Sequence, residues 1–156
     1  MVFKFNSAKA ISYVNNYFGG ANPFYYVFSD EKEGVNFISQ CVFAGCDGFV
    51  ANCPEWFYQN EKNFSQSWVD GEKLKEFLLS KNTCGPLARV VPKRLVTVGD
   101  LVFWKKDCGQ VGAGIVTKMV GEEIFFATKE SFVSEKSLNL VEEKGAVLLH
   151  IFAVKK

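Results

Sequence analysis

Five cysteines and a single histidine are the residues of this chain with the most evident chemistry. A thiol and an imidazole together hydrolyse amides, because the imidazole takes the thiol proton and the thiolate attacks the carbonyl carbon. Such a cysteine belongs at the start of a helix, where the helix dipole lowers its pKa, and the histidine must lie within hydrogen-bond reach. The six candidates are Cys41, Cys46, Cys53, Cys84, Cys108 and His150.

The spacing of the cysteines favours no special site. Their odd number and scattered positions predict free thiols in a reducing cytoplasm rather than a disulfide framework. Cys41 falls on an expected helix and is predicted to be a buried small hydrophobic residue, whereas Cys84 and Cys108 fall in expected loops. Cys46 and Cys53 are separated by six residues in an expected loop, and no second cysteine pair has the spacing of a metal site. Neither a metal site nor a cofactor is therefore predicted.

Composition sets the class of protein. The 156 residues predict one domain spanning 1–156, with 48% apolar and 22% charged residues, as in soluble globular proteins. A net charge of +1 without a basic run argues against nucleic acid or a membrane surface as the main partner. No stretch has the ~20 apolar residues of a membrane span, and the N-terminus lacks the apolar core of a signal peptide. A cytoplasmic location is therefore predicted.

The periodicity of apolar residues changes along the chain from helical to alternating. Helices are expected over 7–18, 35–44 and 70–80, and strands over 87–91, 101–104, 114–118, 123–128 and 146–154. Helices followed by a run of strands with short links predict an α+β fold with an antiparallel sheet.

The segment Glu33-Gly34-Val35-Asn36-Phe37-Ile38-Ser39-Gln40 resembles the Asp-Cys-x-Asn-Phe-Val/Ile-Ser-Gln motif of the bacterial putative amidase domain family. These domains are small cysteine hydrolases allied to the NlpC-type and papain-like peptidases. Further segments similar to the family are Asn22-Pro23, Ala44-Gly45, Trp56-Phe57-Tyr58, Ser67-Trp68-Val69 and Gly99-Asp100-Leu101-Val102-Phe103.

The resemblance implies a papain-like or NlpC-like fold, in which N-terminal helices and a central helix pack on a C-terminal antiparallel sheet. It also implies that both catalytic side chains are missing. The family's nucleophile corresponds to Gly34, and its His-x-Gly-Ile-Val strand corresponds to Gly112-Ala113-Gly114-Ile115-Val116, which puts Gly112 in the histidine position. The residue that orients the histidine would stand near Thr128 or Lys129.

Three functions compete on this basis. The favoured one is a catalytically inactive amidase-like domain that binds a peptide, a cell-wall fragment or a protein partner in the vestigial groove. The second is an active cysteine hydrolase with a rearranged site, in which Cys41, Cys46 or Cys53 works with His150. The third is a structural α+β domain without a groove function. The predicted groove residues are Glu33, Gly34, Asn36, Trp56, Gly112 and Lys129.

Overall fold

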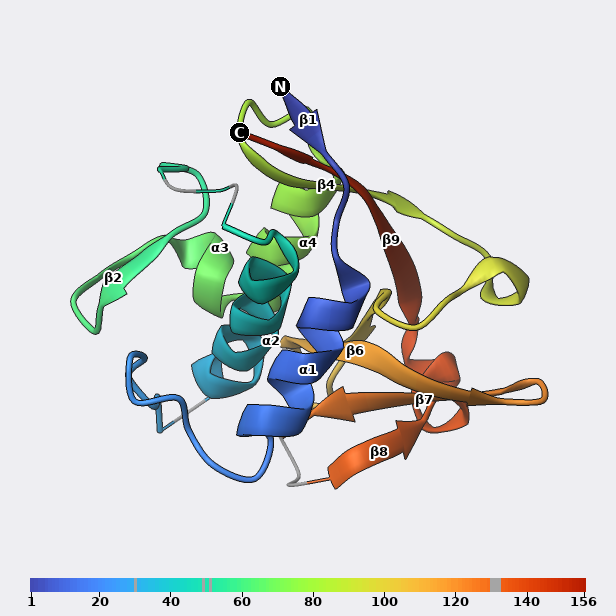
Figure 1. Ribbon diagram of the computed structural model, residues 1–156. Coiled ribbons are helices and arrows are strands. Elements are labelled where there is room, and N and C mark those ends of the chain that lie inside the picture. Colours follow the sequence, from blue (N-terminus) through green and yellow to red (C-terminus); the bar gives the residue numbers. More distant parts are fainter. Residues whose placement is uncertain (30, 49, 51, 130–132) are drawn as a thin grey trace.

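The computed structural model describes residues 1–29, 31–48, 50, 52–129 and 133–156. Helices and an antiparallel sheet both contribute, so the predicted α+β class is confirmed (Figure 1). The α-helices are α1 (Ser7–Tyr17), α2 (Lys32–Gly45), α3 (Gln66–Val69) and α4 (Gly71–Leu79). The strands are β1 (Val2–Phe3), β2 (Tyr58–Asn60), β3 (Asn63–Phe64), β4 (Gly85–Val90), β5 (Leu101–Lys105), β6 (Val111–Val120), β7 (Glu123–Thr128), β8 (Val133–Ser137) and β9 (Val147–Lys155). Short 3-10 turns are η1 (Lys93–Leu95), η3 (Leu138–Leu140) and η4 (Glu142–Lys144).

The main sheet is organised around β9. Its order is β1-β9-β5-β6-β7-β8, with β4 also paired to β9, and all these pairs are antiparallel. Leu149 pairs with both Leu101 and Val90, and Lys155 pairs with both Val2 and Gly85. One edge of β9 therefore runs along β4, and the other meets β5 and then β1. This pairing brings the two chain termini together at one end of the molecule (Figure 1).

The central helix α2 is buried along most of its length, with Ile38, Cys41 and Val42 showing no exposed surface. These residues belong to a helix-side cluster that also holds Leu101, Ala113 and other sheet residues facing α2. A separate far-side cluster lies on the opposite face of the sheet and contains Val102, Trp104, Val116, Phe126, Leu138 and Leu148. Because strand side chains alternate between faces, neighbouring residues of β5 contribute to different clusters.

The other long helices start at side-chain caps. The Asn6 side chain accepts a hydrogen bond from the Lys9 amide (3.0 Å), and the Asp70 side chain accepts one from the Lys73 amide (2.9 Å). Helix α1 runs beside α2, because the Asn6 amide donates to the Gly45 carbonyl (2.8 Å). A methyl group at Gly45 would lie 2.2 Å from the Phe5 ring, so glycine permits this close approach.

The structure differs from the sequence expectations chiefly in short elements and at helix ends. Helix α2 starts at Lys32, three residues earlier than expected, and strands β1, β2, β3 and β8 and helix α3 were not anticipated. Strands of two or three residues are too short to show alternation. Strand β1 forms here by pairing with the distant β9, whereas β2 and β3 pair with each other in a local hairpin. Among the described residues, no helix is long and apolar enough to span a membrane.

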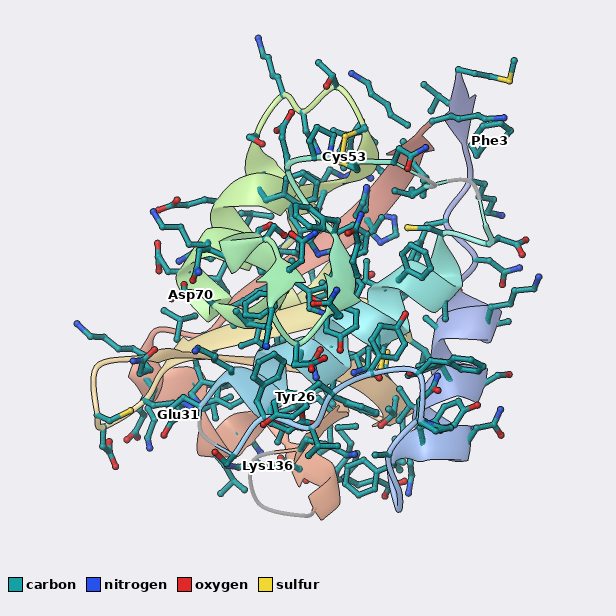
Figure 2. All side chains as sticks on the ribbon, turned by 90° about the vertical axis from the view of Figure 1, so that its left-hand side faces the viewer. Phe3, Tyr26, Glu31, Cys53, Asp70 and Lys136 are labelled. Carbon is teal, nitrogen blue, oxygen red and sulfur yellow. A yellow bond between two sulfur atoms is a disulfide. The ribbon has the colours of Figure 1, made fainter. Side chains whose placement is uncertain are left out.

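The expectation that all five cysteines are free thiols is wrong. Cys53 and Cys84 form a disulfide with their Cα atoms 5.5 Å apart, and Figure 2 shows this sulfur–sulfur bond beside the label of Cys53. The two residues are 31 positions apart in the sequence, so their spacing alone does not indicate that folding brings them together. Cys41 and Cys46 are free and buried, and Cys108 is free and exposed.

Candidate functional site

The first turn of α2 is held by the side chains that flank Gly34. Glu33 Oε1 accepts hydrogen bonds from the Asn36 side-chain amide (2.8 Å) and from the Phe28 backbone amide (3.1 Å). Asn36 also donates to the Tyr26 carbonyl (3.0 Å) and accepts from the Trp68 indole nitrogen (2.9 Å). Asn36 has no exposed surface, and its bond with the Trp68 indole is fully buried. Glu33 and Asn36 therefore bind the segment 26–28 and the Trp68 indole to the first turn of α2.

Position 34 contributes no reactive group to this turn. Gly34 is buried in the first turn of the helix, the location in which a cysteine thiol would have its pKa lowered by the helix dipole. The adjacent Glu33 carboxylate is half-buried and already accepts two hydrogen bonds. The first turn of α2 therefore has a carboxylate but no nucleophile.

Gly112 does not face α2. It pairs with Trp104 across β5 and β6, and a methyl group added at Gly112 would lie 2.5 Å from the Trp104 indole. Trp104 belongs to the far-side cluster, whereas the next pair, Phe103 and Ala113, belongs to the helix-side cluster. A side chain at position 112 would thus project to the face of the sheet opposite α2. Gly34 and Gly112 were expected to face each other across a groove, whereas Gly112 faces Trp104 on the other side of the sheet.

Val111 and Ala113, the β6 residues on either side of Gly112, lie on the helix side of the sheet. Both pack in the helix-side cluster, and Val111 is partly exposed while Ala113 is fully buried. Lys106, in the turn between β5 and β6, forms an ion pair with Glu31, the residue that precedes α2. This contact brings the β5–β6 turn beside the start of the helix. Val111, the first residue of β6, follows this turn and belongs to the helix side of the sheet.

The remaining predicted groove residues differ in accessibility. Trp56 is 1% exposed and its indole nitrogen lies 3.4 Å from the Ser39 hydroxyl, so it belongs to the core rather than to a groove wall. Lys129 is half-buried, and its ammonium group lies 4.9 Å from the centre of the Phe37 ring on α2. Lys129 therefore lies beside α2.

His150 is paired with a carboxylate rather than with a thiol. Its Nδ1 atom is 2.7 Å from Oδ1 of Asp100, and the cavity that it lines contains no cysteine among the described residues. Cys53 is held in the disulfide. Burial raises the pKa of the Cys41 thiol, an effect that the nearby Lys129 ammonium partly offsets, and burial raises the pKa of Cys46 to about 12. None of these thiols is poised to act as a nucleophile.

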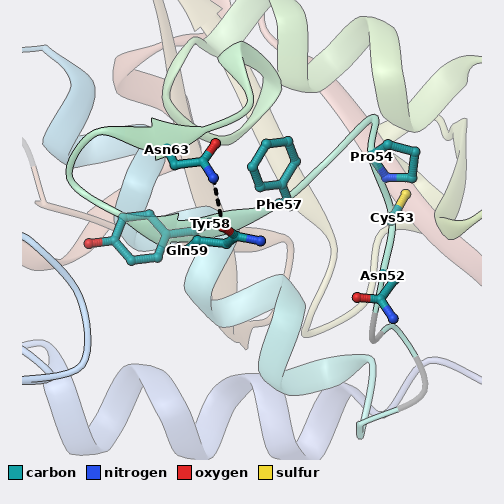
Figure 3. Close-up of a pocket in the computed structure, with 7 residues that line it drawn as sticks. All are labelled: Asn52, Cys53, Pro54, Phe57, Tyr58, Gln59 and Asn63. Atoms are coloured by element: carbon teal, nitrogen blue, oxygen red, sulfur yellow. Dashed lines mark hydrogen bonds between the residues drawn. The ribbon is translucent and has the colours of Figure 1, made fainter.

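Sequence reasoning missed a pocket beside the β2–β3 hairpin (Figure 3). It has a volume of about 330 Å³ and is lined by Asn52, Cys53, Pro54, Phe57, Tyr58, Gln59 and Asn63. The Asn63 side chain donates to Gln59 (2.6 Å) within it. The pocket combines aromatic rings with side-chain amides and has no charged lining residue. The aromatic run at 56–58 is the signal in the sequence that points to this pocket. The predicted groove residues include only Trp56 of this run, which is buried, whereas Phe57 and Tyr58 line the pocket.

This pocket is connected to the start of α2 through two hydrogen bonds. The Tyr58 hydroxyl accepts from the Tyr26 amide (2.7 Å), and the Tyr26 carbonyl accepts from Asn36 (3.0 Å). The Tyr58 ring also lies near Tyr25 and Trp68, with ring centres 5.0 and 6.1 Å away. The pocket wall and the first turn of α2 therefore form one connected assembly of aromatic and amide groups.

A buried central helix on an antiparallel sheet, with the turn Glu33-Gly34-Val35-Asn36 at its start, defines an α+β domain of amidase-like sequence. A family model described as "Putative amidase domain" matches residues 4–150, and the chain belongs to this family. No curated protein and no solved structure matches the chain.

Proposed function

We propose that this chain is a catalytically inactive amidase-like domain, of NlpC or papain-like descent, that binds a peptide or a peptide-bearing cell-wall fragment. The observation that carries the proposal is Gly34 in the first turn of α2, where the family resemblance puts the nucleophilic cysteine. The only histidine, His150, is paired with Asp100 and shares its cavity with no cysteine in the described part of the chain. A cysteine hydrolase needs both groups within hydrogen-bond reach of each other.

The binding part of the proposal rests on the pocket at the β2–β3 hairpin. Phe57 and Tyr58 supply apolar surface, and Asn52, Gln59 and Asn63 supply both donors and acceptors. Side-chain amides match the amide groups of a peptide, and the neutral lining requires no charge on the ligand. A peptide is also the class of ligand on which an amidase scaffold would act.

The active-enzyme alternative has less support. It needs Cys41, Cys46 or Cys53 beside His150, whereas the first two are buried in α2 and its end and the third is disulfide-bonded. The disulfide also bears on location, because disulfides persist in oxidising compartments and are rare in the cytosol. We therefore propose an oxidising compartment in place of the cytoplasmic location predicted from the sequence.

Restoring both catalytic groups on the face that α2 covers is expected to create amide hydrolysis. The native chain should release no product from small peptide amides, and Gly34→Cys with Val111→His should raise turnover by roughly 100-fold over the uncatalysed rate, the lower range for a positioned base. Product release is measured by chromatography, with circular dichroism as the check on folding. The matched control is Gly34→Cys with Gly112→His, which should stay inactive because position 112 faces Trp104.

Two results would overturn the inactive assignment. One is hydrolysis by the native chain that disappears in His150→Gln. The other is hydrolysis by the native chain that disappears when the free cysteines are blocked with iodoacetamide.

Peptide binding is expected to depend on Phe57. We expect a cell-wall stem peptide to bind the native chain in isothermal titration, and Phe57→Ala to weaken binding roughly tenfold or more, because a buried aromatic contact contributes about 1.5–3 kcal/mol. The matched control is Phe152→Ala, an exposed aromatic residue outside this pocket. Unchanged affinity in Phe57→Ala would place the peptide elsewhere.

A further inference from the structure

A second cavity of about 330 Å³ lies where the start of α1, the β4–β9 strand pair and the turn before β5 meet. Its polar lining is dominated by basic groups, namely Lys4, Arg89 and His150, with Ser7 and Asp100 beside them. We infer that this cavity binds a small organic oxyanion, a phosphate or carboxylate group carried on a small molecule. This site is separate from the peptide pocket and does not depend on the proposed loss of catalysis.

Arg89 and His150 are brought together by strand pairing. They are direct partners in the β4–β9 register, so their side chains leave the sheet on the same face. The Arg89 guanidinium lies 5.7 Å from the centre of the Phe152 ring, which also lines the cavity. An arginine held against an aromatic ring at a cavity wall can present its planar fork to two oxygens of one ligand.

Asp100 orients the histidine ring. Its Oδ1 lies 2.7 Å from His150 Nδ1, and its Oδ2 accepts a hydrogen bond from the Thr97 amide (2.8 Å). The Asp100 side chain is 4% exposed, whereas that of His150 is 36% exposed. With Nδ1 directed to the carboxylate, Nε2 is the ring nitrogen that remains for a ligand, and protonation of the ring turns Nε2 into a donor.

The start of α1 adds a positive partial charge to the same cavity. Ser7 is the first residue of this 11-residue helix and lines the cavity. Gly99, with φ of +98°, allows the turn before Asp100 to approach it, since a methyl group at Gly99 would lie 2.6 Å from Ser7 Cβ. Backbone amides at a helix start favour anions. Among the described lining residues, Lys4 and Arg89 thus outnumber the one carboxylate, of which Oδ2 accepts a hydrogen bond and Oδ1 lies against His150.

The single histidine makes this inference directly testable. The chain has one imidazole, so its Cε1 proton signal in NMR belongs to His150 without further assignment. Inorganic phosphate and acetate, titrated at constant ionic strength and at pH 6.5, should each be tested for a saturable shift of this signal. Phosphate alone saturating would assign a phosphate ligand, and acetate alone a carboxylate ligand. Chloride at the same ionic strength should produce no saturable shift.

Arg89→Gln should weaken oxyanion binding roughly tenfold or more, the loss of one charge-assisted hydrogen bond. Arg94→Gln, at the only other arginine of the chain, should leave binding unchanged. Thermal melting checks that each variant is folded. If Arg89→Gln does not fold, Lys4→Gln replaces it, with Lys62→Gln as its control. The absence of a saturable shift with either anion up to about 10 mM, or equal binding by the Arg89 and Arg94 variants, would overturn the site.

Discussion

Asn36→Ala is expected to lower the free energy of unfolding by about 3 kcal/mol. The Asn36 side chain is fully buried and joins three groups, namely the Trp68 indole nitrogen, the Tyr26 carbonyl and the Glu33 carboxylate. Alanine removes the acceptor for an indole that is itself only 1% exposed, and each buried polar group left unpaired costs about 1–3 kcal/mol. The loss should therefore exceed that of an ordinary surface substitution.

Urea denaturation followed by tryptophan fluorescence measures this loss. Asn16→Ala, at an exposed asparagine of α1, is the matched control and should change stability by less than about 0.5 kcal/mol. A double-mutant cycle with Trp68→Phe should show a coupling energy of about 1 kcal/mol between the two side chains, since they share one hydrogen bond. A loss below 1 kcal/mol in Asn36→Ala would mean that the amide is not the anchor of the helix start.

Breaking the disulfide is expected to lower the free energy of unfolding by about 3.5 kcal/mol, the chain-entropy value for a loop of this length. Cys53 and Cys84 close a loop that contains α3, α4 and every lining residue of the pocket beside the β2–β3 hairpin except Asn52, and Cys53 itself is 3% exposed. The substitution Cys53→Ser with Cys84→Ser should therefore also loosen the pocket, because Cys53 forms part of its wall.

The same denaturation experiment, run with and without reductant, measures the contribution of the disulfide. Reductant should shift the native chain and leave the double serine variant unchanged, and Cys108→Ser should behave like the native chain because Cys108 is free and exposed. Thiol titration in denaturant gives an independent count of three without reductant and five with it. Five reactive thiols in unreduced protein would disprove the bond.

Local patterns were sufficient for the longer elements. The helical spacing of apolar residues located α1, α2 and α4, and alternation located the strands from β4 to β7 together with β9, because each of these elements is long enough to show its period. The start of α2 was placed three residues late, because its N-cap residue, Glu31, makes no side-chain capping bond that the sequence could reveal.

The site was less predictable, because it depends on which face of a strand each residue occupies. Gly112 was selected by its place in a motif, yet a shift of one residue moves a side chain to the opposite face of the sheet. Pairing with Trp104 settles that Gly112 belongs to the far side, and burial removes Trp56 from the groove. The spacing of the motif indicates neither the strand face of Gly112 nor the burial of Trp56.

The sequence by itself determined the α+β class, because that follows from local periodicity, and its motifs resemble the amidase family closely enough to place Gly34 where that family has cysteine. Only the tertiary structure decided that Cys53 bonds Cys84, that Gly112 faces away from α2 and that His150 pairs with Asp100 beside Arg89. Each of these contacts joins segments distant in the chain or depends on strand register, and both are products of packing the whole molecule.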